Sequence, residues 1–143
     1  IRAKCRRLKQ QHNLKMVIID YLQLMSSGKK VESRQQEVAE FSRALKLLAK
    51  ELEVPVIAIS QLNRGPEQRT DKRPQMSDLR ESGSIEQDAD VVILLHRDRS
   101  DPERDGEADV IVAKHRNGPT KDIVLAFQGH YSRFNNMARD SGF

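Results

Sequence analysis

The chain has 143 residues, a length that suits one domain of ordinary size or part of a larger one. Hydrophobic residues make up 37% and charged residues 32%, and the net charge of +4 mildly favours a polyanionic partner. A single cysteine excludes an internal disulfide framework, and no apolar run approaches the ~18 residues of a membrane span. Since no signal peptide opens the chain either, we expect a cytoplasmic protein with no membrane partner.

The first part of the chain predicts a helix, a strand, a loop and a second helix. Residues 1–13 are basic with helical periodicity, which indicates a solvated surface helix rather than a nucleic-acid-binding arm. Residues 15–20 are apolar without alternation, as is typical of a parallel strand covered on both faces. A loop over 21–32 leads to the clearest helix, over 33–53, whose apolar residues recur at i, i+3 and i+4 spacing behind Ser33 as N-cap.

The rest of the chain adds strands and a long polar connection. Residues 54–59 predict a second buried strand, so strand, helix and strand follow one another as a right-handed parallel unit. Residues 62–76 lack apolar periodicity and predict a mobile loop, and residues 77–88 predict a short helix. Three more strands are expected at 90–95, 108–113 and 122–127, the last two joined as a hairpin through 116–119. The pattern predicts an α/β fold with a mostly parallel sheet, helices on its faces and a C-terminal hairpin.

Asp20 directly follows the first predicted strand, where open α/β sheets bind their ligands. In NTPases a carboxylate at this position holds Mg²⁺, directly or through a water molecule. An ordinary turn aspartate is an equally open alternative, because an apolar run followed by Asp is common. The phosphate-binding pattern G-x-x-x-x-G-K-[ST] is absent from the sequence. If Asp20 binds Mg²⁺, the chain is only part of an NTPase, and we expect it not to hydrolyse ATP by itself.

Gln61 ends the second strand, beside the strand that ends in Asp20. An amide there can orient the attacking water or sense the terminal phosphate, although a glutamine at a strand end is more often a turn residue. The polar segment 78–90 contains Arg, Gly and Ser, and it can offer backbone N–H groups and a cation to phosphates. A capped helix is the plainer alternative for this segment.

Lys114 and Arg116 place two cations at the end of a strand and its turn. Since alternate residues of a strand point to the same side, the two side chains could reach a target together. In oligomeric NTPases such cations enter the neighbouring subunit's site and neutralise transition-state charge. The common alternative is that Lys114 and Arg116 are ordinary solvated surface residues. The four histidines are scattered, so a zinc site is not expected.

Four strings are much more specific together than any one of them alone. They are MVIIDYLQLM at 16–25, ISQLNR at 59–64, DLRESGSIEQDAD at 78–90 and KHRNGPT at 114–120. In this order, and across essentially the whole chain, they resemble the bacterial replicative DNA helicase family, DnaB. The match is to the later part of its C-terminal RecA-like motor domain. The resemblance implies that residues 1–143 are the C-terminal part of one RecA-like P-loop NTPase core, without the phosphate loop or the strand that carries the catalytic glutamate.

The same resemblance implies roles for individual residues. Asp20 would be the Walker B carboxylate for Mg²⁺, and Gln61 the sensor of the ATP γ-phosphate. Lys114 and Arg116 would act in trans at the adjacent subunit's ATP. The central-channel loop that holds the DNA backbone is matched by Arg80, Glu81 and Gly83.

For the parent protein, the resemblance implies a homo-hexameric, ATP- and Mg²⁺-dependent helicase that encircles single-stranded DNA and unwinds duplex at the replication fork. Primase and a helicase loader are the implied partners, and the implied location is cytoplasmic and nucleoid-associated. Two other interpretations stay open. One is a RecA-like recombination or regulatory ATPase core, and the other is a catalytically inactive module for nucleic-acid binding or oligomerisation. The missing phosphate loop favours the inactive module for this polypeptide, whereas the Gly83 loop together with Lys114 and Arg116 favours a helicase as its parent.

Overall fold

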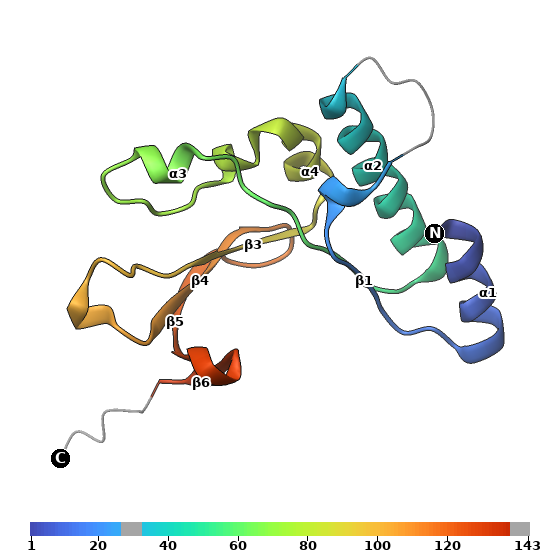
Figure 1. Ribbon diagram of the computed structural model, residues 1–143. Coiled ribbons are helices and arrows are strands. Elements are labelled where there is room, and N and C mark those ends of the chain that lie inside the picture. The colour runs from blue at the N-terminus through green and yellow to red at the C-terminus, as the bar shows by residue number, and fades with distance from the viewer. Residues whose placement is uncertain (27–32, 138–143) are drawn as a thin grey trace. The chain divides into compact units, whose positions relative to one another are not determined.

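The computed structural model describes residues 1–26 and 33–137, so part of the predicted 21–32 loop lies outside the described residues. The chain divides into two compact units (Figure 1). The first comprises Ile1–Asn63 and Ser77–Ala89, and the second comprises Arg64–Met76 and Asp90–Phe143. Within the described residues, no helix has the length and apolar character that crossing a lipid bilayer requires.

The first unit combines helices with a pair of parallel strands. Its regular elements are α1 (Arg2–His12), β1 (Val17–Ile19), α2 (Arg34–Leu52), β2 (Val56–Ala58) and α4 (Gly83–Asp88). Short 3₁₀ turns lie at Leu22–Leu24 and, before α4, at Met76–Ser82. β1 and β2 pair in parallel, with Val17 opposite Val56 and Ile19 opposite Ala58. The prediction of a strand–helix–strand parallel unit is therefore confirmed.

Helix α2 forms as its sequence predicts, and it supplies three of the six buried residues in the core cluster of the first unit. The Ser33 hydroxyl accepts a hydrogen bond from the Gln36 amide at 3.2 Å, which confirms the predicted N-cap. The buried face of the helix packs into one apolar cluster, formed by Cys5, Leu22, Leu45, Leu48, Leu52 and Val54. The core thus joins α1, α2 and the turn that follows β1.

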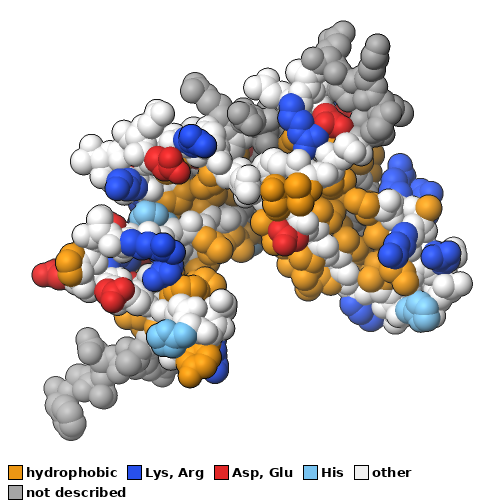
Figure 2. Space-filling model, viewed as in Figure 1, with side chains coloured by type: hydrophobic (Ala, Val, Ile, Leu, Met, Phe, Trp, Pro, Cys, Tyr) orange, Lys and Arg blue, Asp and Glu red, His pale blue; other side chains and the backbone are white. Residues whose placement is uncertain are grey.

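Helix α1 is a solvated basic helix, as predicted (Figure 2). Cys5 is its one buried residue. Arg2 and Arg6 both bind the Glu51 carboxylate near the end of α2. The hydrogen bonds from Arg6 and Arg2 lower the pKa of Glu51 to about 2. Salt bridges at an exposed position contribute little to stability, so the burial of Cys5 in the apolar cluster does more than this contact to hold α1 on α2.

The second unit is built on an antiparallel sheet in the order β3-β4-β5-β6. Its strands are β3 (Val91–His96), β4 (Glu107–His115), β5 (Lys121–Gln128) and β6 (Arg133–Asn136). It also holds the short helix α3 (Gly65–Gln68) and 3₁₀ turns at Pro102–Arg104 and Gly129–Tyr131. β4 and β5 pair antiparallel, which confirms the predicted C-terminal hairpin.

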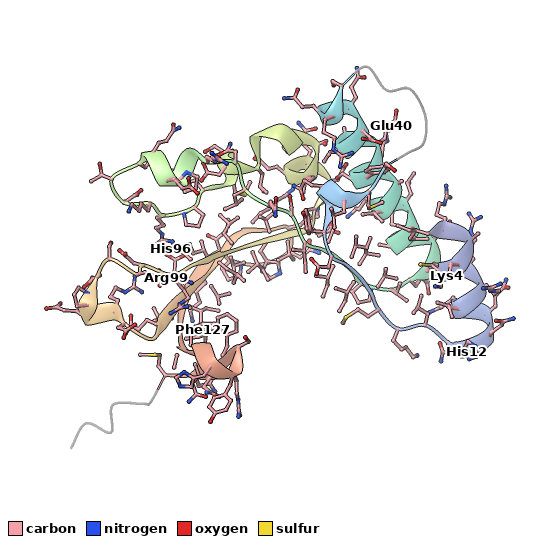
Figure 3. All side chains as sticks on the ribbon, viewed as in Figure 1. Lys4, His12, Glu40, His96, Arg99 and Phe127 are labelled. Carbon is pink, nitrogen blue, oxygen red and sulfur yellow. The ribbon has the colours of Figure 1, made fainter. Side chains whose placement is uncertain are left out.

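An aromatic pair closes the end of this sheet. Phe127 of β5, labelled in Figure 3, packs on Phe134 of β6 with the ring centroids 5.0 Å apart. The Arg97 guanidinium lies 4.2 Å from the Phe127 ring centroid. Tilted aromatic pairs and cation–π contacts each add to apolar burial. The strand β6 was not predicted, because Arg133–Asn136 has one large apolar residue and no alternation that a sequence pattern could reveal.

The described strands do not confirm a mostly parallel sheet, although the α/β composition is as predicted. One strand pairing is parallel and three are antiparallel. The strand expected at 90–95 is β3, which pairs antiparallel with β4. The connection between them is a surface loop with one 3₁₀ turn, and such a short connection can join only antiparallel neighbours. Burial on β3 alternates, with Ile93 55% and Leu95 61% exposed.

Candidate functional site

The carboxyl-terminal ends of β1 and β2 meet at one edge of the first unit. Their pairing continues past the strands, because the Ile59 amide donates to the Ile19 carbonyl at 2.9 Å. The Leu22 amide then donates to the Ile59 carbonyl, also at 2.9 Å. Asp20 follows Ile19 directly and Gln61 comes two residues after Ile59, so the structure places both at the same edge.

Asp20 is exposed at this edge, and its carboxylate has no partner among the described residues. It makes no hydrogen bond or ion pair with any residue that the structure describes. Within residues 1–26 and 33–137, no three His, Cys, Asp or Glu side chains gather as a set of metal ligands. Asp20 is therefore a candidate ligand as a single carboxylate and not as part of a cluster of such side chains. This arrangement suits Mg²⁺, which keeps several waters and is commonly held by one or two carboxylates together with substrate phosphates.

Gln23 connects the two loops at the edge, and sequence reasoning did not single it out. Its Nε2 donates to the Ser60 hydroxyl at 2.9 Å and lies 3.3 Å from the Gln61 carbonyl oxygen. Its Oε1 accepts from the Gln61 amide at 3.2 Å. One side-chain amide thus fixes the backbone of Gln61 from both its donor and its acceptor side.

Arg34, at the start of α2, holds the loop that carries Gln23. Its Nη2 donates to the Gln23 carbonyl at 2.6 Å, and its Nη1 donates to the Met25 carbonyl at 2.8 Å. Arg34 also forms an ion pair with Glu37 one turn later in the helix. The helix α2 therefore positions the loop after β1, and through Gln23 it positions Gln61 as well.

Replacing Gln23 with alanine in the full-length protein should slow ATP turnover by about 10- to 100-fold, because small misplacements of a reacting group cost rates of this order. ATP binding should change little, since Gln23 bonds to the protein and not to the strand-end carboxylate. Steady-state kinetics would show a lower kcat with a nearly constant KM. Gln10→Ala, an exposed glutamine on α1, is the matched control. Wild-type kcat in the Gln23 variant would contradict this role.

The segment predicted to contact DNA belongs to the same compact unit and begins close to Gln61. The Asn63 amide donates to the Asp78 carbonyl at 3.0 Å, and Asp78 and Leu79 are buried. Gly83, the first residue of α4, is exposed and has open space where a Cβ would lie. The side chains of Arg80 and Glu81 lie outside the described part of the structure. At its far end, α4 is fastened to α2 by a 2.8 Å hydrogen bond from Ser42 to Asp88.

Lys114 and Arg116 belong to the second unit, so they are not in the same compact unit as Asp20 and Gln61. Lys114 lies in β4 opposite Val92, and Arg116 is the first residue after that strand. The Arg116 guanidinium contacts the Asp90 carboxylate at 3.2 Å, with the two side chains 55% and 52% exposed. An exposed pair of this kind is worth only about 0–1 kcal/mol. Arg116 can therefore exchange Asp90 for another anion at little cost.

The turn after Arg116 is tightly built. The His115 Nδ1 lies 3.4 Å from the Pro119 carbonyl oxygen, across the turn. A Cβ at Gly118 would come within 2.4 Å of the His115 ring, so glycine fits where a larger residue would displace the imidazole. The turn therefore holds a defined shape at the tip of the β4–β5 hairpin, next to both cations.

Comparison with known proteins points to one family. The family described as "DnaB-like helicase C terminal domain" matches residues 1–136. The replicative DNA helicase DnaB of Leifsonia xyli subsp. xyli (strain CTCB07) is 79% identical over 141 residues, which cover 96% of this chain and 31% of that relative. The chain thus spans about a third of the relative's length.

Two solved structures resemble the chain with a TM-score of 0.90 and 46% sequence identity each. One is described as an ATPase domain, and the match covers 96% of this chain and 50% of that one. The other is described as a DnaB-like replicative helicase and its interactions with primase, with 96% of this chain and 35% of that one covered.

Proposed function

Because the chain belongs to the DnaB-like helicase C-terminal domain family, we propose that it is the later part of the RecA-like ATPase domain of a replicative DNA helicase. In this proposal residues 1–143 are the C-terminal part of one domain, and another part of the full-length protein provides the phosphate loop. The observation that carries the proposal is the meeting of Asp20 and Gln61 at the carboxyl-terminal edge of paired parallel strands.

Asp20 and Gln61 have different roles near the ATP γ-phosphate. Bound Mg²⁺ supplies charge neutralisation at the β- and γ-phosphates. Asp20 would hold that ion, directly or through a water molecule, and its lack of a partner among residues 1–26 and 33–137 supports this role. Gln61 senses the γ-phosphate or orients the attacking water, and the hydrogen bonds from Gln23 fix its backbone for that task.

The site is completed by a neighbouring copy of the protein. Lys114 and Arg116 of one subunit reach the ATP of the next in a homo-hexameric ring, where they neutralise charge that develops during phosphoryl transfer. The weak, exposed pair between Arg116 and Asp90 supports this role, because the guanidinium can leave it readily.

Single-stranded DNA is the polymer on which the ring moves, as it unwinds duplex at the replication fork. The loop formed by Arg80, Glu81 and Gly83 contacts the sugar–phosphate backbone, and the open space at Gly83 supports close approach. A relative's structure is described by its interactions with primase, which makes primase a proposed partner here, together with a helicase loader. The proposed location is the cytoplasm, on the nucleoid.

Replacing Arg80 with alanine in the full-length protein should weaken binding to single-stranded oligonucleotides of every sequence about equally. Lys and Arg contacts to phosphate release counterions and read no bases, so the slope of log affinity against log salt should fall by roughly 0.7 per lost contact. Fluorescence anisotropy over a salt series measures both effects. Arg7→Ala, on the exposed basic face of α1, is the matched control and should leave the slope unchanged.

The same experiment separates the competing functions. An unchanged salt slope in the Arg80 variant would argue against DNA contact by this loop. A full-length protein that binds single strands but does not separate a forked duplex when ATP is added would support the inactive binding module instead. ATP-dependent strand separation is the result that the proposal predicts.

A further inference from the structure

A buried carboxylate on β4 is held by a network of arginines. Asp109 is 4% exposed, and Arg104 grips it with two hydrogen bonds, from Nη2 to Oδ1 at 2.6 Å and from Nη1 to Oδ2 at 3.1 Å. These hydrogen bonds hold the pKa of Asp109 below its usual value, so the group is charged at neutral pH. Asp109 is therefore a fixed negative charge inside the second unit.

A second cation reaches Asp109 from a distant part of the chain. Arg73 Nη1 lies 3.6 Å from Asp109 Oδ2, and Arg73 Nη2 donates to Asp122 Oδ2 at 2.5 Å. Asp109 is on β4 and Asp122 is on the neighbouring strand β5, whereas Arg73 belongs to segment 64–76. The Arg73 guanidinium thus attaches segment 64–76 to the β4–β5 hairpin.

Hydrogen bonds with neighbouring side chains hold the main chain at Arg73. Arg69 Nη2 donates to the Arg73 carbonyl at 2.5 Å, and the Asp71 carboxylate accepts from the Arg73 amide at 3.3 Å. Lys72 adopts a left-handed conformation with φ of 47°, and Pro74 is buried. Two side chains and a tight turn therefore fix the backbone from which Arg73 extends.

The segment leaves and re-enters the first unit at a single point. The hydrogen bond between the Asn63 amide and the Asp78 carbonyl brings its two ends together, so residues 64–76 form an Ω-type loop with a closed neck. Gln61 lies two residues before this neck, and Arg80 lies two residues after it. The neck therefore joins the proposed γ-phosphate sensor to the proposed DNA-contacting loop.

We propose that Arg73 is a positioning residue that couples DNA binding to ATP hydrolysis. Through its ion pair with Asp109, it fastens the 64–76 loop to β4, which carries Lys114 near its end and is followed directly by Arg116. A displacement of that hairpin then pulls on the neck, where Gln61 and the 78–84 segment begin. The inference rests on the proposed function and adds a residue and a route to it.

The two acidic partners of Arg73 differ in a way that provides a matched control. Asp109 is nearly inaccessible, whereas the Asp122 side chain is 61% exposed and the Arg73 side chain 37%. The hydrogen bond to Asp122 is exposed to solvent and contributes little, whereas the ion pair with the buried Asp109, at 3.6 Å, is screened much less by water and salt. Loss of the Asp122 charge should therefore leave the Arg73–Asp109 ion pair in place, whereas loss of the Arg73 charge should release the 64–76 loop from the hairpin.

The test compares ATP turnover by the full-length protein with and without a single-stranded oligonucleotide. In Arg73→Met we expect the stimulation by DNA to fall by about tenfold, with turnover in the absence of DNA and ATP affinity within about twofold of wild type. Arg73→Lys keeps the charge and should restore part of the stimulation. Asp122→Asn should behave like wild type. Hydrogen exchange should become faster in residues 64–76 of Arg73→Met alone.

Three results would overturn the inference or its premise, and each is distinct. Full stimulation in Arg73→Met, despite faster exchange in the loop, would show that Arg73 is only structural. An equal fall of turnover with and without DNA would show general damage rather than lost coupling. A wild-type protein whose turnover does not respond to DNA would instead remove the proposed function itself.

Discussion

Replacing Arg116 with alanine in the full-length protein should abolish ATP hydrolysis, lowering single-turnover rates by about 10³-fold or more. The reason is electrostatic, because a guanidinium donated to a neighbour's site neutralises charge that appears only in the transition state. Nucleotide affinity, measured with a fluorescent ATP analogue, should stay within a few-fold. Ring assembly, measured by mass photometry, should be unaffected, since Arg116 is an exposed turn residue whose ion pair with Asp90 is weak.

Arg99→Ala is the appropriate control for this substitution. Arg99 is an exposed arginine of the same compact unit, located in the loop between β3 and β4 (Figure 3). Its loss should leave turnover near wild type. If Arg116→Ala retained most of its activity, or if it lost nucleotide binding and hydrolysis together, the proposed role in transition-state neutralisation would be wrong.

Replacing Asp20 with asparagine should lower turnover by about 100-fold or more, the scale on which loss of one electrostatic contact to a developing charge is felt. The amide has the same shape as the carboxylate but no charge for Mg²⁺, so the Mg²⁺ concentration for half-maximal turnover should rise as well. A Mg²⁺ titration of the ATPase rate measures both changes. The fold should tolerate the substitution, because Asp20 is exposed and has no partner among the residues that the structure describes.

Asp105→Asn provides the matched control, because Asp105 is also an exposed loop aspartate. Its turnover and Mg²⁺ dependence should equal those of wild type. An Asp20 variant with a lower rate but an unchanged Mg²⁺ dependence would point to a role in positioning rather than in holding the ion.

The sequence predicts those features that depend on neighbours close along the chain. Helix α2 follows from its apolar period and its Ser33 cap, and the β4–β5 hairpin follows from two strands joined by a short turn. The edge that brings Asp20 and Gln61 together follows from two apolar runs separated by a helix. In the first two cases the physical cause lies within a few residues of the element, and in the third it lies in the order of strand, helix and strand along the chain.

Strand direction and long-range polar contacts could not be predicted in the same way. On β3 the exposed Ile93 and Leu95 are as apolar as the buried Val92 and Leu94, so the sequence hides the alternation and suggests a parallel core strand. The residues of β3 do not indicate which strand pairs with it, or that the pairing is antiparallel.

The polar contacts show the same limit. Gln23 bonds to Ser60 and Gln61, more than thirty residues away, and nothing around it in the sequence marks it. Segment 62–76 suggests a mobile loop because it lacks apolar periodicity, yet it contains α3 and is held through Arg73 by charge. With 25 Lys and Arg and 21 Asp and Glu in the chain, no sequence pattern could select that pairing.

Mixing two inactive variants tests most directly the claim that each ATP site is built from two copies of the protein. Arg116→Ala subunits keep Asp20, and Asp20→Asn subunits keep Arg116. In randomly mixed rings about a quarter of the interfaces should pair an intact Asp20 with an intact Arg116. We predict that ATP turnover, which is about 100-fold or more below wild type in either variant alone, returns on mixing to as much as about a quarter of the wild-type rate. No recovered turnover, in rings whose subunits are shown to have exchanged, would contradict the account.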